Sequence, residues 1–439
     1  MTAATLDTRA QQPTTEPPRS DGEVQELVAE LTGRAKAASR VLAVAPTARK
    51  NAALERAAAA LETDAVRAAV SAANADDLAR AAHAQLAPAL VDRLVLNEAR
   101  MDAMVAGLRQ VAALPDPVGA LVQHRRLESG LEVARMRVPL GLIGIVYESR
   151  PNVTVDAAAL CVKSGNAVVL RGGKEAFASN GALAAVFEDA LRAEGLPPEA
   201  VTLVPTTDRR ATKALIGLEG VVDLAIPRGG TGLIRFVTEH ARVPVIQHYQ
   251  GVCHVYVDAG ADLDKALAIA VNAKTQRPGV CNAMETLLVD AAVAPAFLPR
   301  LAGALDGVTL HADARALPHL PGAEAAGAEA FGHEYLALEL AVAVVDGLDG
   351  ALAHVARHGS QHTEAIVTES YATARRWVRE VDASCVLVNA STRFNDGFQL
   401  GLGAEMGIST TKLHAYGPMG LEELCALKWV GFGEGHVRS

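Results

Sequence analysis

The stretch Asn272-Ala-Lys-Thr-Gln-Arg-Pro-Gly-Val-Cys-Asn-Ala-Met-Glu-Thr-Leu-Leu-Val289 begins polar and basic and ends apolar. Pro278 and Gly279 predict a tight turn, and residues 286–289 are typical of a buried strand. Cys281 is therefore expected on a turn at the mouth of a strand, with Lys274 and Arg277 close in sequence. Nearby cations favour the thiolate, the reactive form of cysteine, so the pattern fits a nucleophile. Spacing alone leaves open that Cys281 is a small buried hydrophobic residue.

The composition is typical of a large α/β protein. The chain has 439 residues, half of them hydrophobic and 4% aromatic, which is enough for two or three domains. The net charge of −9, without a long basic run, argues against nucleic-acid binding. Five cysteines without a CxxC pair indicate a reducing compartment. No apolar run has the length of a membrane span and no signal-peptide pattern is present, so we expect a soluble cytoplasmic protein without a membrane partner.

Strands alternate with helices in two series, which predicts doubly wound parallel sheets. Residues 1–22 lack apolar periodicity and predict a disordered tail, whereas 23–114 is helical in pattern. The first series has expected strands at 143–147, 167–171, 201–204, 222–226 and 243–246. The second has them at 255–257, 286–289, 340–345, 365–368 and 385–388. We assign no structure to 307–333 and expect a Gly-rich loop at 396–420, a helix at 421–427 and a strand at 428–432.

Residues 120–138 alternate in polarity around Ser129-Gly130, which predicts a β-hairpin. A two-stranded hairpin is marginal by itself, so it needs something to pair with. A second subunit is one candidate.

The sequence lacks the common dinucleotide-binding motifs, so a dinucleotide site would have to be built in another way. It has neither Gly-x-Gly-x-x-Gly after its first strand nor a Gly-x-x-x-x-Gly-Lys-[Ser/Thr] loop. Arg228-Gly229-Gly230-Thr231 follows a strand and opens a helix. Its backbone amides could hold a phosphate, or it could be an ordinary strand–helix turn.

Three histidines, His354, His358 and His362, recur every fourth residue. A helical pair at this spacing can bind zinc, but no Glu accompanies them and Gly359 should end the helix. We therefore expect no metal site.

Several blocks together resemble the gamma-glutamyl phosphate reductase (glutamate-5-semialdehyde dehydrogenase) branch of the aldehyde dehydrogenase superfamily. The nucleophile block is Thr275-Gln-Arg-Pro-Gly-Val-Cys281-Asn-Ala-Met-Glu-Thr. The others occupy 138–156, 163–173, 226–230, 359–366, 388–394, 401–410, 412–414 and 417–423. Long blocks in the family's order, from about residue 23 to the C-terminus, form a specific signal.

The resemblance implies an aldehyde-dehydrogenase-like α/β fold, with two doubly wound parallel-sheet domains and a β oligomerisation flap. The cofactor-binding domain would comprise 23–119 and 139–253, and the catalytic domain 254–400. The hairpin 120–138 and the segment 401–439 would form the flap, in a homodimer or homotetramer.

The implied reaction is the reduction of L-glutamyl 5-phosphate by NADPH to L-glutamate 5-semialdehyde, with release of phosphate. Cys281 would attack the acyl phosphate and form a thioester, which splits one difficult step into two easier ones. The oxyanion needs fixed donors, for which the candidates are the Cys281 backbone N–H and the Asn152 side chain; Asn152 is also a residue that commonly forms turns after Pro. Hydrolytic aldehyde dehydrogenases carry a water-activating Glu where this chain has His248, so we expect negligible formation of carboxylate.

The resemblance also assigns the ligands. The adenosine ribose would lie near Arg171 and Gly172, the pyrophosphate at Arg228, Gly229 and Gly230, and the nicotinamide ribose at Glu334. Arginine suits bidentate contacts to phosphate and carboxylate, and Arg277 is the first choice for the substrate phosphate. The full set of expected substrate-binding residues is Arg150, Lys274, Arg277, Asn389, Arg393 and Lys412, although Arg and Lys are mostly solvated surface residues.

Two alternatives stay open. The chain could be another acylating or aldehyde-oxidising dehydrogenase of the superfamily, or a catalytically silent binding protein on this fold. The upstream glutamate kinase is a candidate partner because glutamyl phosphate is labile, but no docking motif is visible.

Overall fold

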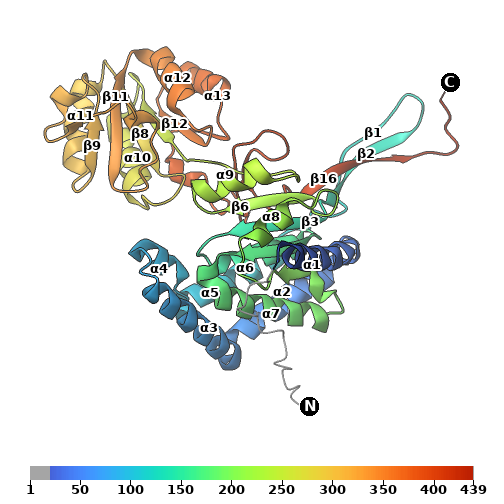
Figure 1. The fold of residues 1–439 in the computed structure, drawn as a ribbon. Coiled ribbons are helices and arrows are strands. Elements are labelled where there is room, and N and C mark those ends of the chain that lie inside the picture. The colour runs from blue at the N-terminus through green and yellow to red at the C-terminus, as the bar shows by residue number, and fades with distance from the viewer. Residues whose placement is uncertain (1–19, 439) are drawn as a thin grey trace. The chain divides into compact units, whose positions relative to one another are not determined.

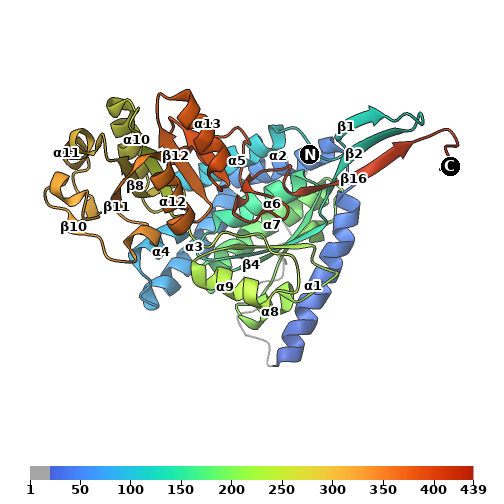
Figure 2. The ribbon, with the colours of Figure 1, turned by 90° about the horizontal axis from the view of Figure 1, so that it is seen from above.

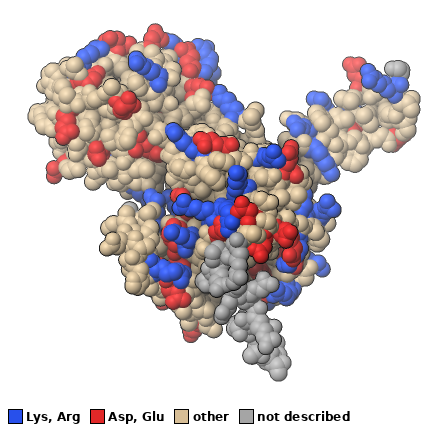
Figure 3. Space-filling view, viewed as in Figure 1, with Lys and Arg blue, Asp and Glu red and all other residues tan. Residues whose placement is uncertain are grey.

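The computed structural model describes residues 20–438 and divides into two units. The described part of the first unit comprises 20–246, Leu402–Gly407 and 419–438, and the second unit comprises Gln247–Gly401 and Ile408–Pro418. None of the described helices combines the length and apolarity that a membrane span requires. On the face drawn in Figure 3, basic and acidic residues are interspersed.

The first unit contains a four-stranded parallel sheet in the order β5-β4-β3-β6. Its strands are β3 (Leu142–Tyr147), β4 (Ala167–Gly172), β5 (Val201–Leu203) and β6 (Leu224–Arg228). Both faces are covered, by α6 (Asn152–Lys163) and α7 (Phe177–Ala193) on one side and α8 (Arg210–Ile216) and α9 (Thr231–His240) on the other (Figures 1 and 2). The strand expected at 243–246 is reduced to one bridge between Ala225 and Val245.

Among the residues from 20 onward, five helices precede this sheet: α1 (Asp21–Leu42), α2 (Thr47–Glu62), α3 (Asp64–His83), α4 (Pro88–Leu94) and α5 (Glu98–Ala113). Helix α1 begins at a capping box in which Ser20 and Glu23 bond each other's backbone N–H groups. Residues 20–22 are therefore ordered, and the prediction of a disordered tail is wrong for them. Residues 1–19 of that predicted tail lie outside the described residues.

The predicted hairpin is present and has a third strand. The strands β1 (Leu121–Arg126), β2 (Glu132–Pro139) and β16 (Cys425–Phe432) form an antiparallel sheet that projects from the four-stranded sheet as an arm (Figures 1 and 2). The helix expected at 421–427 is wrong, because β16 begins at Cys425 and pairs with β2 along its whole length. A partner strand almost 300 residues away in sequence outweighs local helix propensity.

The second unit contains a seven-stranded sheet in the order β10-β9-β11-β8-β7-β12-β13, with every recorded pair parallel. The strands are β7 (Cys253–Val257), β8 (Met284–Asp290), β9 (Thr309–Ala312), β10 (Glu324–Ala325), β11 (Glu339–Val345), β12 (Thr363–Val367) and β13 (Cys385–Val388). The segment 307–333, left unassigned from the sequence, supplies the edge strands β9 and β10 and two short 3-10 helices, η3 (Leu317–His319) and η4 (Ala330–Gly332).

Helices cover both faces of this sheet too. One core cluster lies against α10 (Leu263–Thr275) and α11 (Ala294–Ala304), and the other against α12 (Gly347–His358) and α13 (Tyr371–Glu380). Val255 faces the first cluster and its neighbour Tyr256 faces the second, as side-chain alternation along a strand requires. A separate two-stranded sheet consists of β14 (Gly407–Ser409) and β15 (Gly417–Met419).

Candidate active site

Cys281 lies on the turn that joins α10 to β8. Helix α10 ends at Thr275, and the turn closes with a 3.0 Å hydrogen bond from the Ala283 N–H to the Val280 carbonyl. Pro278 and Gly279 lie in this turn, as the sequence indicates. Cys281 is partly buried and precedes β8, so the candidate nucleophile lies at the amino ends of the parallel strands in the second unit.

Two neighbouring backbone segments fix the Cys281 peptide. The Cys253 thiol, at the start of β7, donates to the Cys281 carbonyl at 3.2 Å. Gly251 packs so close that a Cβ there would come within 1.9 Å of the same carbonyl oxygen. Only glycine allows this approach.

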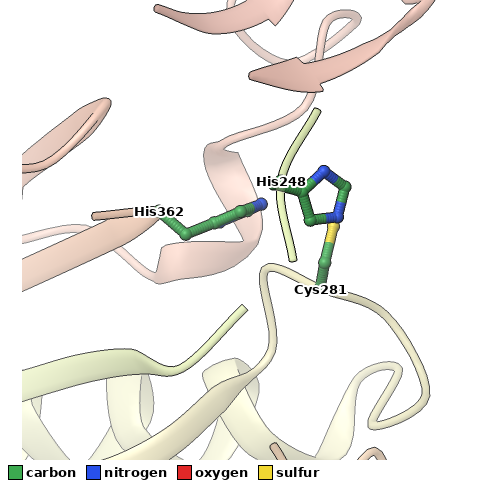
Figure 4. Close-up of side chains that lie close together, drawn as sticks. All are labelled: His248, Cys281 and His362. Atoms are coloured by element: carbon green, nitrogen blue, oxygen red, sulfur yellow. The ribbon is translucent and has the colours of Figure 1, made fainter. Parts of the chain in front are cut away.

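Two histidines accompany Cys281 in the second unit. One ring nitrogen of His248, one of His362 and the Cys281 Sγ lie within 4.8 Å of one another. Figure 4 shows the His248 ring at the Cys281 sulfur and an edge of the His362 ring turned toward them. The Nδ1 of His248 lies 2.9 Å from the Ile408 carbonyl, so Nε2 is the nitrogen that faces the thiol. Neither histidine was predicted as a catalytic residue; the only signal was that His248 stands where relatives of the superfamily carry a Glu.

His362 is fully buried, directly before β12. Burial, and next the charge of His248, lower the pKa of His362 to about 3, so its ring is neutral. Its Nδ1 lies 2.7 Å from the Thr363 hydroxyl and 3.6 Å from the Cys253 Sγ. Its Nε2 has no hydrogen-bond partner among the described residues.

Arg277 and Arg393 lie near Cys281 on the same unit. Arg277 is exposed, and the Nε of Arg393 donates to the Gln276 side chain at 2.8 Å. Burial, followed by the positive charge of Arg277, lowers the pKa of Arg393, while the charge of Asp396 and, after it, that of the Cys281 thiolate act in the opposite direction. Arg393 also lines a pocket of about 670 Å³ with residues of α10 and of the loop after β13. Two like charges beside a thiol can attract a polyanionic substrate.

Lys274 was predicted to bind substrate, and the structure argues against it. Its side chain is completely buried, and Nζ lies 2.6 Å from the Glu285 Oε2, which is equally buried. Burial lowers the pKa of Lys274 and raises the pKa of Glu285 to about 7. The pair supports the turn from inside the unit. The prediction failed because the spacing of residues in the sequence does not show which of them are buried.

Two other predicted substrate residues have partners of their own. Lys412 lies 2.6 Å from a carboxylate oxygen of Asp382. The Asn389 side chain is bonded at both ends to the Thr368 backbone, with 2.9 Å on each side. Thr368 is five residues along the chain from Thr363, at the opposite end of β12, a distance of about 16 Å at ~3.3 Å per residue. Asn389 thus lies at the opposite end of β12 from Thr363, and it lines the same pocket as Arg393, so its role in substrate binding stays a prediction.

Glu334 lies in the loop before β11 and accepts a 2.9 Å hydrogen bond from the Gly251 N–H. Burial raises the pKa of Glu334. The carboxylate is therefore joined through Gly251 to the peptide of Cys281.

The predicted pyrophosphate turn of the first unit has the expected geometry. Strand β6 ends at Arg228, and α9 begins at Thr231. The Glu148 carboxylate accepts the Gly230 N–H at 2.9 Å, and a Cβ on Gly229 would come within 2.6 Å of it. An anionic group thus already lies at this helix N-terminus, which supports the fit of a phosphate.

The remaining predicted residues of the first unit have local partners. Arg171 is buried, and its guanidinium donates to the carbonyls of Gly172, Thr207 and Asp208, so it joins the end of β4 to the loop after β5. Asn152 was expected in a turn but is the first residue of α6, and its Nδ2 donates to Asp156 at 3.0 Å. Arg150 lies just before this helix and is half-buried.

Comparison with known proteins connects this geometry to a family. Residues 10–317 match the model described as the aldehyde dehydrogenase family. The chain is 57% identical over 412 residues to the gamma-glutamyl phosphate reductase of Sorangium cellulosum, which covers 93% of this chain and 97% of that one. It is 55% identical to that of Salinibacter ruber, over 96% of this chain and 97% of the relative.

Solved structures agree. The crystal structure of gamma-glutamyl phosphate reductase from Thermotoga maritima superposes with a TM-score of 0.91, at 43% identity, over 94% of this chain and 100% of that one. An acetylating aldehyde dehydrogenase from Geobacillus thermoglucosidasius, 18% identical, superposes with a TM-score of 0.68 over 96% of this chain and 100% of the other, and shares the fold. The predicted aldehyde-dehydrogenase-like α/β fold is confirmed.

Proposed function

Because this chain belongs to the gamma-glutamyl phosphate reductases of the aldehyde dehydrogenase family, we propose that it reduces L-glutamyl 5-phosphate to L-glutamate 5-semialdehyde with NADPH. It is an oxidoreductase, and the resemblance stated from its sequence holds. The observation that carries the proposed mechanism is the cluster of Cys281, His248 and the two arginines Arg277 and Arg393 within the second unit.

The reaction begins with formation of a thioester. His248 takes the thiol proton on Nε2, because its Nδ1–H is directed to the Ile408 carbonyl. The Cys281 sulfur attacks the acyl carbon, the bond to the phosphate oxygen breaks, and His248 returns the proton to the departing phosphate. Arg277 and Arg393 neutralise the phosphate charge. Within the second unit the Cys281 N–H is the candidate donor to the oxyanion, and the resemblance assigns the second donor to Asn152.

NADPH, when bound, supplies the hydride that reduces the thioester carbonyl. The tetrahedral adduct then loses the Cys281 sulfur as thiolate, aldehyde leaves, and a proton from solvent reaches the sulfur through His248. With arginines holding phosphate at the site, phosphate rather than water accepts the acyl group in the reverse direction. We therefore propose that little carboxylate is formed.

The resemblance assigns cofactor-binding groups in each of the two units. Gly229 and Gly230 open α9 and would hold the pyrophosphate, after the Glu148 carboxylate has moved away. Arg171 and Gly172 end β4, where the adenosine ribose would bind, and Glu334 would hold the nicotinamide ribose. For the 2′-phosphate that distinguishes NADPH we propose Lys174 and Arg209, both exposed and both in segments that follow β4 and β5.

The same proposal assigns roles to the larger parts. The first unit would bind the dinucleotide and the second would carry the chemistry. The arm of β1, β2 and β16 would join subunits of a homodimer or homotetramer, and large side chains such as Leu121, Trp429 and Phe432 are exposed on it. The lability of glutamyl phosphate also makes the upstream kinase a proposed partner of this assembly.

The test runs the reaction backwards. Purified protein is given glutamate 5-semialdehyde and NADP, with and without phosphate, and reduced cofactor is followed by absorbance. We expect reduction that requires phosphate and disappears in Cys281→Ser. Reduction without phosphate would indicate a hydrolytic dehydrogenase, and activity only on other aldehydes would overturn the substrate. Silence on every aldehyde would leave a binding protein on this fold.

A further inference from the structure

We propose that Cys281, His248 and His362 form a binding site for a zinc ion, which holds the nucleophile in an inactive state. The inference goes beyond the proposed reaction. It concerns the enzyme without substrate, so it can fail or succeed independently of which aldehyde is used.

The ligand set suits zinc. One thiolate and two imidazoles are typical zinc ligands, and a fourth position would remain for water. Ideal tetrahedral bonds of about 2.3 Å to sulfur and ~2.05 Å to nitrogen separate the ligand atoms by about 3.3–3.6 Å. The three atoms lie within 4.8 Å of one another. Small side-chain rotations, with no movement of strands, would therefore close the site.

The unpaired atom of His362 points to a ligand. The ring is fully buried, Nε2 has no hydrogen-bond partner among the described residues, and its edge is turned toward His248 and Cys281 (Figure 4). A buried polar atom without a partner costs free energy, which a bound ion would offset.

The surroundings of His362 are compatible with the tautomer that leaves a lone pair on this nitrogen. The Cys253 thiol proton is directed to the Cys281 carbonyl, so the Cys253 sulfur faces His362 as an acceptor. The Nδ1 of His362 has this sulfur and the Thr363 oxygen as neighbours. The Thr363 oxygen also accepts from the Asn395 amide at 2.7 Å. In the tautomer with the proton on Nδ1, Nε2 keeps its lone pair, and metal binding would select that tautomer.

His248 is oriented in the same way. Its Nδ1 is directed to the Ile408 carbonyl, the arrangement by which a backbone oxygen orients a metal-binding imidazole. Binding of the ion displaces the thiol proton to solvent, and the sulfur lone pair is then shared with the metal. The thiolate can no longer attack an acyl phosphate, and it is also protected from alkylation.

The experiment measures binding directly. Metal-free protein is titrated with Zn²⁺ against a chromophoric chelator, and with Co²⁺ to look for the thiolate-to-cobalt charge-transfer band. We expect one ion per chain, a charge-transfer band that is absent in Cys281→Ser, and slower alkylation of the thiol when Zn²⁺ is bound. His362→Asn should weaken zinc binding on the order of tenfold or more.

His354→Asn is the matched control. His354 lies on α12 and also has a buried ring nitrogen without a hydrogen-bond partner among the described residues, but it is outside the cluster. Its loss should leave zinc affinity within about twofold, a change too small for a lost ligand. Equal affinity of the His362→Asn and unchanged proteins would overturn the proposal. A cobalt complex of the unchanged protein without the thiolate band would also overturn it. This second test does not depend on whether the His362 variant folds.

Discussion

Gly251→Ala is the sharpest test of how the nucleophile is positioned. A Cβ at residue 251 would lie 1.9 Å from the Cys281 carbonyl oxygen and 2.8 Å from its Cα, whereas real contacts of a Cβ stay above 3.0 Å. Both atoms belong to the backbone, so no side chain can rotate to make room. The Cys281 peptide must move by about 1 Å.

A displacement of about 1 Å at a reacting group can cost about a hundredfold in rate, or ~2.7 kcal/mol of activation free energy. We expect kcat of the reverse reaction to fall by about that factor, and overpacking to lower the free energy of unfolding by about 1–3 kcal/mol. Initial rates at saturating substrate and urea unfolding measure the two effects.

Gly327→Ala provides the control, because a Cβ at this loop glycine of the same unit meets nothing within 4 Å. Gly327→Ala adds the same methyl group as Gly251→Ala but without a clash, so its kcat should stay within about twofold of that of the unchanged protein. A Gly251→Ala protein with unchanged kcat and unchanged stability would refute the view that this glycine positions Cys281.

Three further predictions concern other parts of the molecule. Lys274→Met leaves the buried Glu285 carboxylate without its cation and should lower the free energy of unfolding, measured in urea, by about 3–5 kcal/mol. The double variant Lys274→Met/Glu285→Leu should recover most of the lost stability. A loss below about 1 kcal/mol in the single variant would contradict the prediction. Glu148→Gln removes the negative charge that receives the Gly230 N–H, so NADP should bind about two- to fivefold more tightly by titration calorimetry at low salt; weaker binding would mean that Glu148 supports the cofactor. Burial, followed by the charge of a neighbouring histidine, lowers the pKa of His354 to about 3, so the unfolded chain takes up a proton below about pH 6.5 that the folded chain refuses. The stability that this group contributes is complete above that pH and is lost as the pH falls from about 6.5 toward 3. Between pH 7.5 and 5 the urea midpoint of His354→Gln should therefore fall less than that of the unchanged protein. Equal falls of the two midpoints would contradict the lowered pKa of His354.

Local signals located the turn of Cys281 correctly. Pro278 and Gly279 favour a turn, and the short apolar run after them forms β8. The strand at Cys425–Phe432 was mistaken in part for a helix, because its pairing partner Glu132–Pro139 is remote in sequence. Propensity is a weak guide when tertiary pairing decides.

The site could be predicted only as far as its motifs reach. Cys281 stands in a characteristic block, but His362 joins it from the start of a strand some 80 residues later. The spacing groups His362 with His354 and His358, a set from which no metal site is expected. Lys274 and Arg277 look alike as basic residues before the thiol, yet one is buried in an ion pair and the other is exposed. Which side of a helix end faces the core depends on packing that the sequence pattern does not determine.

The hydrogen bond from Gly251 to Glu334 has a consequence for the timing of motions. Gly251 touches the Cys281 carbonyl and donates its N–H to Glu334, the proposed anchor of the nicotinamide ribose. The nucleophile and the hydride donor would thus be tied to one residue rather than to two independent loops. Thermal displacement of that residue carries both in the same direction, so their separation fluctuates less than either position does.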